Sequence, residues 1–452
     1  MPVRDIKISA KFPLNQKRIL STWWPLAASW LLITVEGPLL AAFIARTANP
    51  EINLAAWGIA FPIVLLLGSP ALALLPTSTS FSKDVHSFRK LLNFSLVLVA
   101  ILTSLHAAIA FTPLYGILVK GLLGIPDELF EPARTGLRIL LPFIAAVGVR
   151  RLIHGVLIRF GFSRSVTISS GIRLGIEAVV LVIFFQFFPD VEGIILASAT
   201  FTAGVFGEAI YAVLRVKPIL RNQLSNAPPP ESPLTIAPIL DFFTPLVLTI
   251  LIGVTVQPMV AAALSRMPDP VSSLAIWPII IGMLTVFTSA AHAYVEVVVV
   301  LLDEPRSLRV FHRFTMKLGL ALIVFLFLFN VTPISLYWFR DVLALPEYLV
   351  VEARRSLWIM SLMPGLAVFD SLSSGTLMNG RRTRGITLAI LLSLICAFLL
   401  IIGGIAIGSW SGITVCLLAL AIGGFLRSGM LWYAGRSVRQ EILRRDANVT
   451  QN

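Results

Sequence analysis

The sequence is a succession of twelve apolar stretches, each long enough to cross a lipid bilayer as a helix. Such a crossing takes roughly 20 apolar residues, because the hydrocarbon core of a bilayer is about 30 Å thick. Helices are predicted at 22–46, 54–80, 91–118, 136–159, 166–188, 193–214, 240–264, 274–301, 314–339, 356–379, 385–408 and 411–434. Only 13% of the 452 residues are charged, about half the fraction of a typical soluble protein. We therefore expect an all-α, polytopic membrane protein without a separate soluble domain.

The polar segments between these stretches alternate in charge. Basic segments are the N-terminus with Lys11, then 83–90, 159–164, 217–221, 306–317, 381–384 and the C-terminus. The segments between them are acidic or uncharged: 49–51, 127–131, 190–192, 269, 341–347 and 408–412. Basic loops face the cytoplasm in membrane proteins, which predicts an inner (plasma) membrane protein with both termini cytoplasmic. Topology then explains most of the formal net charge of +13, and no nucleic-acid partner is expected.

The two halves of the chain are related by an internal repeat, in which adding 220 to a residue number in the first half gives its counterpart in the second. Eleven of the thirty-three positions from Pro25 to Trp57 are identical to their counterparts, without a gap. The pairs include Pro38 and Pro258, Arg46 and Arg266, Pro50 and Pro270, Trp57 and Trp277, and later Arg134 and Arg354. Each copy has six helices, an even number, so both copies enter the membrane from the same side. Parallel repeats of this kind build transporters in which two bundles rock about a central cavity, and alternating access is the predicted mechanism.

The repeat also sets the expected domain boundaries. A cytoplasmic tail is predicted at 1–20, a six-helix bundle at 21–215, a Pro-rich cytoplasmic linker at 216–237, a second six-helix bundle at 238–434 and a tail at 435–452. The segment 1–20 has no short apolar run with a cleavage site, so a mature tail is expected rather than a signal peptide. Cys396 and Cys416 lie in apolar stretches and are expected to pack there.

Arg150, Arg151 and His154 form the first candidate site. Ionisable side chains at membrane depth are costly and usually face a cavity or a charged partner. Residues 150 and 154 lie one helical turn apart, so these groups could bind a carboxylate or phosphate together. Two alternatives are an internal ion pair and extension of the side chains toward the cytoplasmic headgroups, since Arg159 and Arg164 follow.

Four further residues are candidates for a gate or for ion coupling. Asp370 is the repeat counterpart of Arg150, and a pair between the bundles could close a gate that an anionic substrate opens. The alternative is that each is paired within its own bundle. Glu208 and Arg427 lie in equivalent helices, one residue out of register. Glu36 precedes Gly37-Pro38, where a helix can bend, and could take a proton or sodium ion; a structural, hydrogen-bonded acid is the alternative.

Arg173 adds a fourth basic residue to the predicted anion site. It stands four residues before Glu177, a spacing at which the two are expected to pair. His292 and Glu296 have the same spacing, and we expect them to be solvated near the cytoplasmic end of their helix.

Motifs for catalysis are missing from the sequence. It contains no Walker phosphate loop, paired acidic metal motif, nucleophile elbow or Cys/His metal cluster. We therefore expect no enzyme activity, no cofactor and no metal site, and transport that is either coupled to an ion or downhill.

Several stretches resemble a known group of transporters. They are Trp24-Pro25-Leu26, Leu140-Leu141-Pro142-Phe143 leading to Ile153-His154-Gly155-Val156-Leu157, and Leu357-Trp358-Ile359-Met360-Ser361-Leu362-Met363-Pro364 leading to Ser374-Gly375-Thr376-Leu377. The chain resembles the multidrug/oligosaccharidyl-lipid/polysaccharide (MOP, MATE-like) flippase superfamily, and within it most resembles the progressive ankylosis family. His154 matches the histidine of that family's pattern, whereas Asp370 stands where a basic residue is expected.

The resemblance implies an exporter of small multivalent anions such as citrate, pyrophosphate or nucleotides, embedded in the lipid bilayer. One alternative is a flippase of lipid-linked oligosaccharides, which needs a wide, basic cavity open to lipid. Another is a proton- or sodium-coupled multidrug exporter, which needs an acidic cavity lined by aromatic residues. A membrane enzyme or scaffold that transports nothing is disfavoured by the full-length repeat and by the missing catalytic motifs.

Overall fold

The computed structural model describes residues 14–227, 234–380, 382 and 384–449, and every regular element among them is a helix. Lys11, Arg381 and the central part of the predicted linker, 228–233, lie outside the described residues.

The first half contains α1 (Gln16–Thr34), α2 (Glu36–Ile44), α3 (Pro50–Leu72), α4 (Leu74–Phe81), α5 (Val85–Phe111), α6 (Leu114–Gly116), η1 (Ile117–Leu123), η2 (Asp127–Leu129), α7 (Phe130–Ile139), α8 (Phe143–Arg159), α9 (Ser163–Phe187), α10 (Gly193–Ile219) and η3 (Leu220–Leu224). The second half contains α11 (Ile236–Leu264), α12 (Pro270–Leu301), α13 (Ser307–Val331), α14 (Pro333–Tyr337), η4 (Trp338–Val342), α15 (Glu347–Ile359), α16 (Met363–Asn379), α17 (Arg384–Ile407), α18 (Gly412–Ala434) and α19 (Arg436–Val449).

By length and composition, these helices provide up to twelve candidate membrane spans among the described residues. Eleven are long and apolar enough by themselves, and the twelfth is α7 with α8, bent by 40°. The all-α, polytopic fold is confirmed. Six of the predicted helices contain short breaks that were not predicted from the sequence, at 35, 73, 112–113, 140–142, 332 and 360–362. Pro142 and Pro364 lie at or beside two of these breaks, and proline cannot donate the backbone hydrogen bond that would continue a helix.

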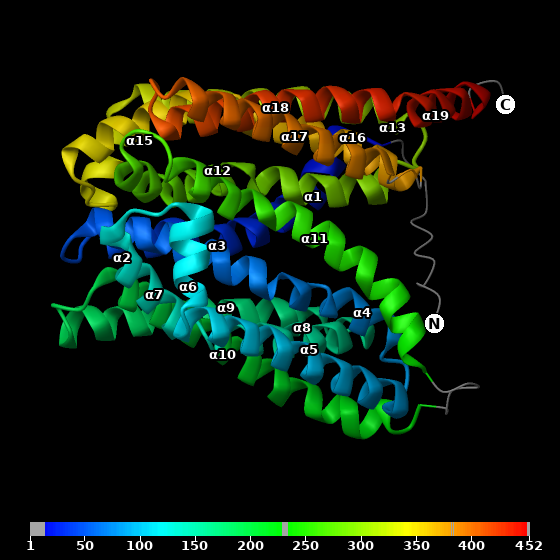
Figure 1. Cartoon of the computed structure of the whole chain (residues 1–452). Helices are drawn as coiled ribbons and strands as arrows, with labels where there is room; N and C mark the ends of the chain where they lie inside the picture. The colour runs from blue at the N-terminus through cyan, green and yellow to red at the C-terminus, as the bar shows by residue number, and fades with distance from the viewer. Residues whose placement is uncertain (1–13, 228–233, 381, 383, 450–452) are drawn as a thin grey trace.

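The two halves lie side by side and exchange parts of their first helices (Figure 1). On α1, Ile19 and Trp23 join an apolar cluster with Tyr294 of α12, and the Trp23 Nε1 donates a hydrogen bond of 2.9 Å to the carbonyl of Ala290. On α11, the Phe243 ring lies against Phe94 of α5 at 5.1 Å. The bundles predicted at 21–215 and 238–434 are therefore linked by two crossing helices, α1 and α11.

Two predicted polar segments are partly helical. The linker predicted at 216–237 begins within α10, continues through η3 and ends after α11 has begun. Ile219 and Leu224 are buried in an apolar cluster, which explains why the helix extends this far. The tail predicted at 435–452 contains α19, whose Val438 and Ile442 lie one turn apart and are buried.

The repeat is visible in local geometry as well as in sequence. The counterparts Asn49 and Asp269 both adopt a left-handed conformation, with φ of 51° and 52°, before the proline that opens a helix. The Arg134 Nε donates a hydrogen bond of 3.0 Å to the Ala110 carbonyl. In the second half, the Nη2 of Arg354, the counterpart of Arg134, donates a hydrogen bond of 3.1 Å to the carbonyl of Asn330, the counterpart of Ala110. The predicted repeat therefore governs structure outside the helices too.

Asp84 caps α5, and its replacement by alanine is expected to lower the free energy of unfolding by about 1 kcal/mol at neutral pH. Its Oδ1 accepts hydrogen bonds of 2.9 Å from the backbone N–H groups of His86 and Ser87. Burial alone would raise the pKa of this carboxyl, but the hydrogen bonds from Ser87 and His86 outweigh burial and lower the pKa.

The sign of the pH effect follows from that lowered pKa. The stabilisation is fully present above the ordinary carboxyl pKa of about 4 and is lost as pH falls through the lower, folded-state value. Thermal unfolding of the wild-type protein and of the Asp84→Ala protein in detergent, measured from pH 7 downward, should show melting temperatures that converge as the pH falls. A difference that widens toward acid would contradict this assignment.

Candidate functional site

A cavity of about 320 Å³ within the first half brings together six of the predicted site residues. Arg150, Arg151 and His154 of α8, Arg173 of α9, Glu36 of α2 and Glu208 of α10 all line it. We call this the charged cavity. The structure thus brings the four residues of the predicted anion site together with two of the predicted gate or coupling residues, Glu36 and Glu208.

Close helix packing positions the charged groups. Gly204 and Gly207 of α10 face α9, where a Cβ atom on Gly204 would collide with the Glu177 side chain and one on Gly207 would collide with Ile176. A Cβ atom at either position would force these side chains to shift, so the two glycines allow α9 and α10 to approach with Glu177 and Ile176 in their present positions. The approach places Glu177 and Glu208 near the cations of the cavity.

Arg150 is paired with Glu208 within the first half. The Arg150 Nη1 donates to the Glu208 Oε2, and both side chains are almost fully buried. The Ser169 hydroxyl lies 3.0 Å from the His154 Nε2 and 3.4 Å from the Glu208 Oε1, and Ser170 also donates to this oxygen at 3.4 Å. A continuous polar chain therefore runs from Arg150 through Glu208 to His154, and sequence reasoning did not identify its serines.

Arg173 connects two carboxylates. Its Nη2 donates to the Glu36 Oε1 and its Nε donates to the Glu177 Oε1 at 2.9 Å. The pairing of Arg173 with Glu177 is confirmed, while the bond to Glu36 was not predicted. The guanidinium also lies 4.7 Å above the centre of the Phe201 ring, a favourable cation–π distance.

Arg151 is the cation of this cavity that has no carboxylate partner. Within the described residues, no carboxylate oxygen lies within 4.0 Å of its guanidinium. Its Nε is buried and lacks a hydrogen-bond partner there. The charged cavity therefore holds one guanidinium whose charge is available to an incoming anion.

The predicted pair between Arg150 and Asp370 is wrong for this structure. Asp370 of α16 is paired with Arg427 of α18, with 2.7 Å between the Asp370 Oδ2 and the Arg427 Nη2, and it also accepts a hydrogen bond from Ser428. Arg150 and Asp370 occupy equivalent helices, and each pairs with the equivalent neighbouring helix of its own half. Equivalence in the repeat thus gave equivalent pairs of reversed polarity rather than one pair across the halves.

The second cavity, of about 390 Å³, lies between the two halves and is named here the central cavity. Trp30, Trp57 and Phe61 of the first half line it together with Gln257 and Trp277 of the second. The Trp277 Nε1 donates a hydrogen bond of 2.9 Å to the Gln257 Oε1. The Trp57 ring stacks on the Phe61 ring with 5.0 Å between ring centres. The shared tryptophans of the repeat were the sequence signal for this cavity.

Glu36 lines both cavities. It is the first residue of α2, directly after the break between α1 and α2 at Val35. The carboxylate therefore stands where a change in the central cavity can reach the ion pairs of the charged cavity.

His292 and Glu296 contact α1 rather than only solvent. The His292 ring stacks on Trp30 with 5.1 Å between ring centres, and the Glu296 Oε1 accepts a hydrogen bond of 3.1 Å from the Trp30 Nε1. The expectation that these two residues are solvated is thus incomplete, because both hold the Trp30 ring in place.

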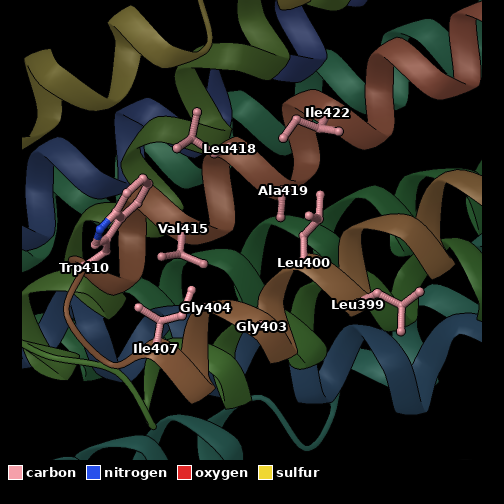
Figure 2. Close-up of a pocket in the computed structure, with 10 residues that line it drawn as sticks. All are labelled: Leu399, Leu400, Gly403, Gly404, Ile407, Trp410, Val415, Leu418, Ala419 and Ile422. Atoms are coloured by element: carbon pink, nitrogen blue, oxygen red, sulfur yellow. The ribbon is translucent and has the colours of Figure 1, made fainter.

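A further cavity, of about 300 Å³, is lined by α17, α18 and Trp410 between them (Figure 2). Figure 2 shows only aliphatic side chains, glycines and the Trp410 ring around it, including Leu399, Leu400 and Ile422. No titratable side chain lines this cavity, so it offers no group that could bind a charged substrate.

Among the described residues, no group of three or more His, Cys, Asp or Glu side chains could hold a metal ion. Cys396 and Cys416 are free thiols, and Cys416 is buried.

The chain is similar to known proteins in structure rather than in sequence. No protein-family description matches the sequence, and no curated protein matches it. A multidrug resistance MATE family transporter of the MOP superfamily in its inward-facing conformation is similar with a TM-score of 0.72 at 15% identity, covering 92% of this chain and 99% of that chain. An outward-facing conformation of a multidrug resistance MATE family transporter is similar with a TM-score of 0.59 at 15% identity, covering 94% of this chain and 96% of that chain.

A MOP superfamily transporter from Pyrococcus furiosus, described as having a binding pocket of reverse polarity, gives a TM-score of 0.57 at 15% identity and covers 95% of this chain and 99% of that one. Likeness at such identities concerns the fold and not the substrate. The twelve-span, two-repeat fold of this chain is the fold of the MATE family transporters in the MOP superfamily.

Proposed function

We propose that this protein is a secondary transporter that moves a small multivalent anion across the membrane by alternating access. The duplicated twelve-span fold and a cavity between the halves support the mechanism. The observation that supports an anion is Arg151, a cavity-lining guanidinium with no carboxylate partner among the described residues. A guanidinium binds carboxylate or phosphate oxygens through two parallel hydrogen bonds.

Citrate, pyrophosphate and nucleotides are the proposed substrates, as the resemblance to the progressive ankylosis family implies. A multivalent anion needs a second cation besides Arg151. The Arg173 Nη2 group can serve once Glu36, which now accepts its hydrogen bond, has taken up a proton or is paired with a sodium ion, while the Arg173 Nε keeps its bond to Glu177. Binding of the anion and of the coupling ion to Glu36 is then thermodynamically linked.

The membrane potential favours the export direction. A cell interior is electrically negative, so outward movement of one negative charge gains about 2.3 kcal/mol per 100 mV. The proposal therefore requires no ATP-hydrolysing partner.

The second candidate function is export of cationic drugs, and the central cavity favours it. This cavity is lined by Trp30, Trp57 and Trp277, carries the Glu36 carboxylate and has no lysine or arginine in its lining. Aromatic faces and a carboxylate attract organic cations. The neighbouring multidrug resistance transporters share this fold.

Purified protein in liposomes is expected to release loaded radiolabelled citrate, pyrophosphate or a nucleotide in a saturable manner, and not to move a cationic dye. The reason is that the unpaired charge of the site is positive. Empty liposomes and protein with Arg151 replaced by glutamine are the controls. Movement of the dye with none of the anions would refute the anion proposal in favour of the second candidate.

A further inference from the structure

Arg46 and Arg266 each reach from one half of the molecule to the other. The Arg46 Nη2 donates hydrogen bonds of 3.1 and 2.7 Å to the carbonyls of Asp341 and Val342 in η4. The Arg266 Nη1 donates 2.7 Å to the Leu123 carbonyl, and its Nη2 donates to the Leu122 carbonyl, both in η1.

The two contacts are equivalent under the repeat. Arg46 and Arg266 are repeat counterparts, and so are their acceptors Val342 and Leu122. Each guanidinium is also anchored on the helix that precedes it, since the Arg46 Nη1 donates a hydrogen bond of 2.6 Å to the Ala42 carbonyl of α2 and the Arg266 Nη1 donates one of 2.7 Å to the Ala262 carbonyl of α11. The first half therefore holds the second in the same manner as the second holds the first.

The acceptor carbonyls are suited to a cation. They lie at the C-terminal ends of the short helices η1 and η4, where carbonyl groups lack a partner within the helix. The guanidinium remains charged at all physiological pH values, so this contact needs no carboxylate and does not depend on protonation.

A third contact joins the halves at the same end of the molecule. Glu51, in the first turn of α3, accepts hydrogen bonds from Ser272 of α12 and from Tyr348 of α15. This end carries α2 and α15 and is opposite to α19 (Figure 1). The loops here are the acidic and uncharged ones.

We propose that Arg46 and Arg266 form a two-fold latch that closes the transport path at the face opposite α19, and that the latch must release before this face opens. The proposal depends on alternating access but not on the identity of the substrate. Neither arginine lines the charged or the central cavity, so the latch acts on the conformation and not on substrate contacts.

With both termini in the cytoplasm, as the sequence predicts, the face opposite α19 is the outer face. An inward-facing transporter is closed on that face, so the comparison structures support a closed state of it. The chain is more similar to the inward-facing transporter, with a TM-score of 0.72, than to the outward-facing one, with 0.59. A latch that is formed in the first state and broken in the second is the arrangement that the proposal requires.

The test uses electron–electron distance measurements on the full chain in lipid nanodiscs without substrate. Spin labels are attached at Glu128→Cys and Ser409→Cys, one in each half near the latched face, after both native cysteines have been replaced by alanine. A second label pair at Lys83→Cys and Arg309→Cys reports on the opposite face. All four sites are exposed.

Loss of either latch arginine should raise the population with a long 128–409 distance and a short 83–309 distance. Arg46→Ala or Arg266→Ala alone is expected to shift the equilibrium between the closed and open conformations of this face about tenfold or more, as the loss of hydrogen bonds to a charged group does. The two substitutions together should shift it further. Arg46→Lys and Arg266→Lys, which keep the charge but lose the forked geometry, should give intermediate shifts and provide a milder test if an alanine variant fails to fold.

Arg134→Ala and Arg354→Ala are the matched controls. These arginines also donate to backbone carbonyls and are also repeat counterparts, but each does so within its own half, so neither should alter the distances. Unchanged distributions in the folded latch variants, or equal shifts in the controls, would overturn the latch. Because no substrate is present, distances can shift in a protein that fails to transport anions, which separates this proposal from the proposed function.

Discussion

Replacement of Glu208 by alanine is expected to lower the free energy of unfolding by about 3–5 kcal/mol, the cost of leaving a buried charge without its partner. The side chains of Arg150 and Glu208 are 10% and 3% exposed, so the few waters that reach them compensate poorly for the lost carboxylate. Thermal unfolding in detergent, followed by tryptophan fluorescence, measures the loss.

Two controls isolate the buried pair. Glu347→Ala breaks an ion pair between Glu347 and Arg340, whose side chains are 61% and 52% exposed, and it should lower the stability far less, because water and salt screen an exposed pair. Replacing both members of the buried pair, as Arg150→Met with Glu208→Leu, should recover most of the stability, because no unpaired charge remains. A Glu208→Ala protein as stable as the Glu347→Ala protein would show that Arg150 does not depend on Glu208.

Anion transport is expected to fall by about ten- to a hundredfold when Arg151 is replaced by glutamine, the effect of losing a hydrogen bond to a charged group. The melting temperature should stay nearly constant, because no ion pair of Arg151 is broken in the described part of the chain. The measurement is initial flux from liposomes at several substrate concentrations, with the protein content of each preparation determined.

Arg355→Gln is the matched control for this experiment. Arg355 is an exposed arginine on α15 that lines neither the charged nor the central cavity, so its replacement should leave the flux unchanged. An equal loss in both variants would indicate a general effect of positive charge near the membrane. Full activity of the Arg151→Gln protein would remove the proposed anion site.

The reversed polarity of the two equivalent ion pairs explains why the candidate site is asymmetric. In the first half the arginine of the pair is on α8, in the cavity wall, while in the second half the aspartate takes the equivalent place on α16. The first half also carries Arg151, His154 and Arg173, so the described cationic groups of the cavity come from one copy of the repeat. The two halves share one scaffold, and the candidate site arises from the few side chains in which they differ.

Sequence alone determined the fold class because its signals are local or periodic. Apolar runs of sufficient length must become helices in a bilayer, where every backbone group needs a partner. Matches such as Trp57 with Trp277 and Arg46 with Arg266 revealed the repeat, and the cost of buried charge selected Glu36, Arg150, Arg151, His154, Arg173 and Glu208 as site residues.

Only the tertiary structure decided which of these residues meet. The pairing of Arg150 with Glu208 and of Asp370 with Arg427 depends on how neighbouring helices pack. The exchange of α1 and α11 between the halves depends on contacts between distant parts of the chain, such as the hydrogen bond from Trp23 to Ala290. Periodicity states which face of a helix is apolar, but it does not state which other helix will cover that face or at what height two charges will lie. Helix partners and charge pairs are set only when the chain packs, because they depend on residues that are distant in sequence and become neighbours in the folded protein.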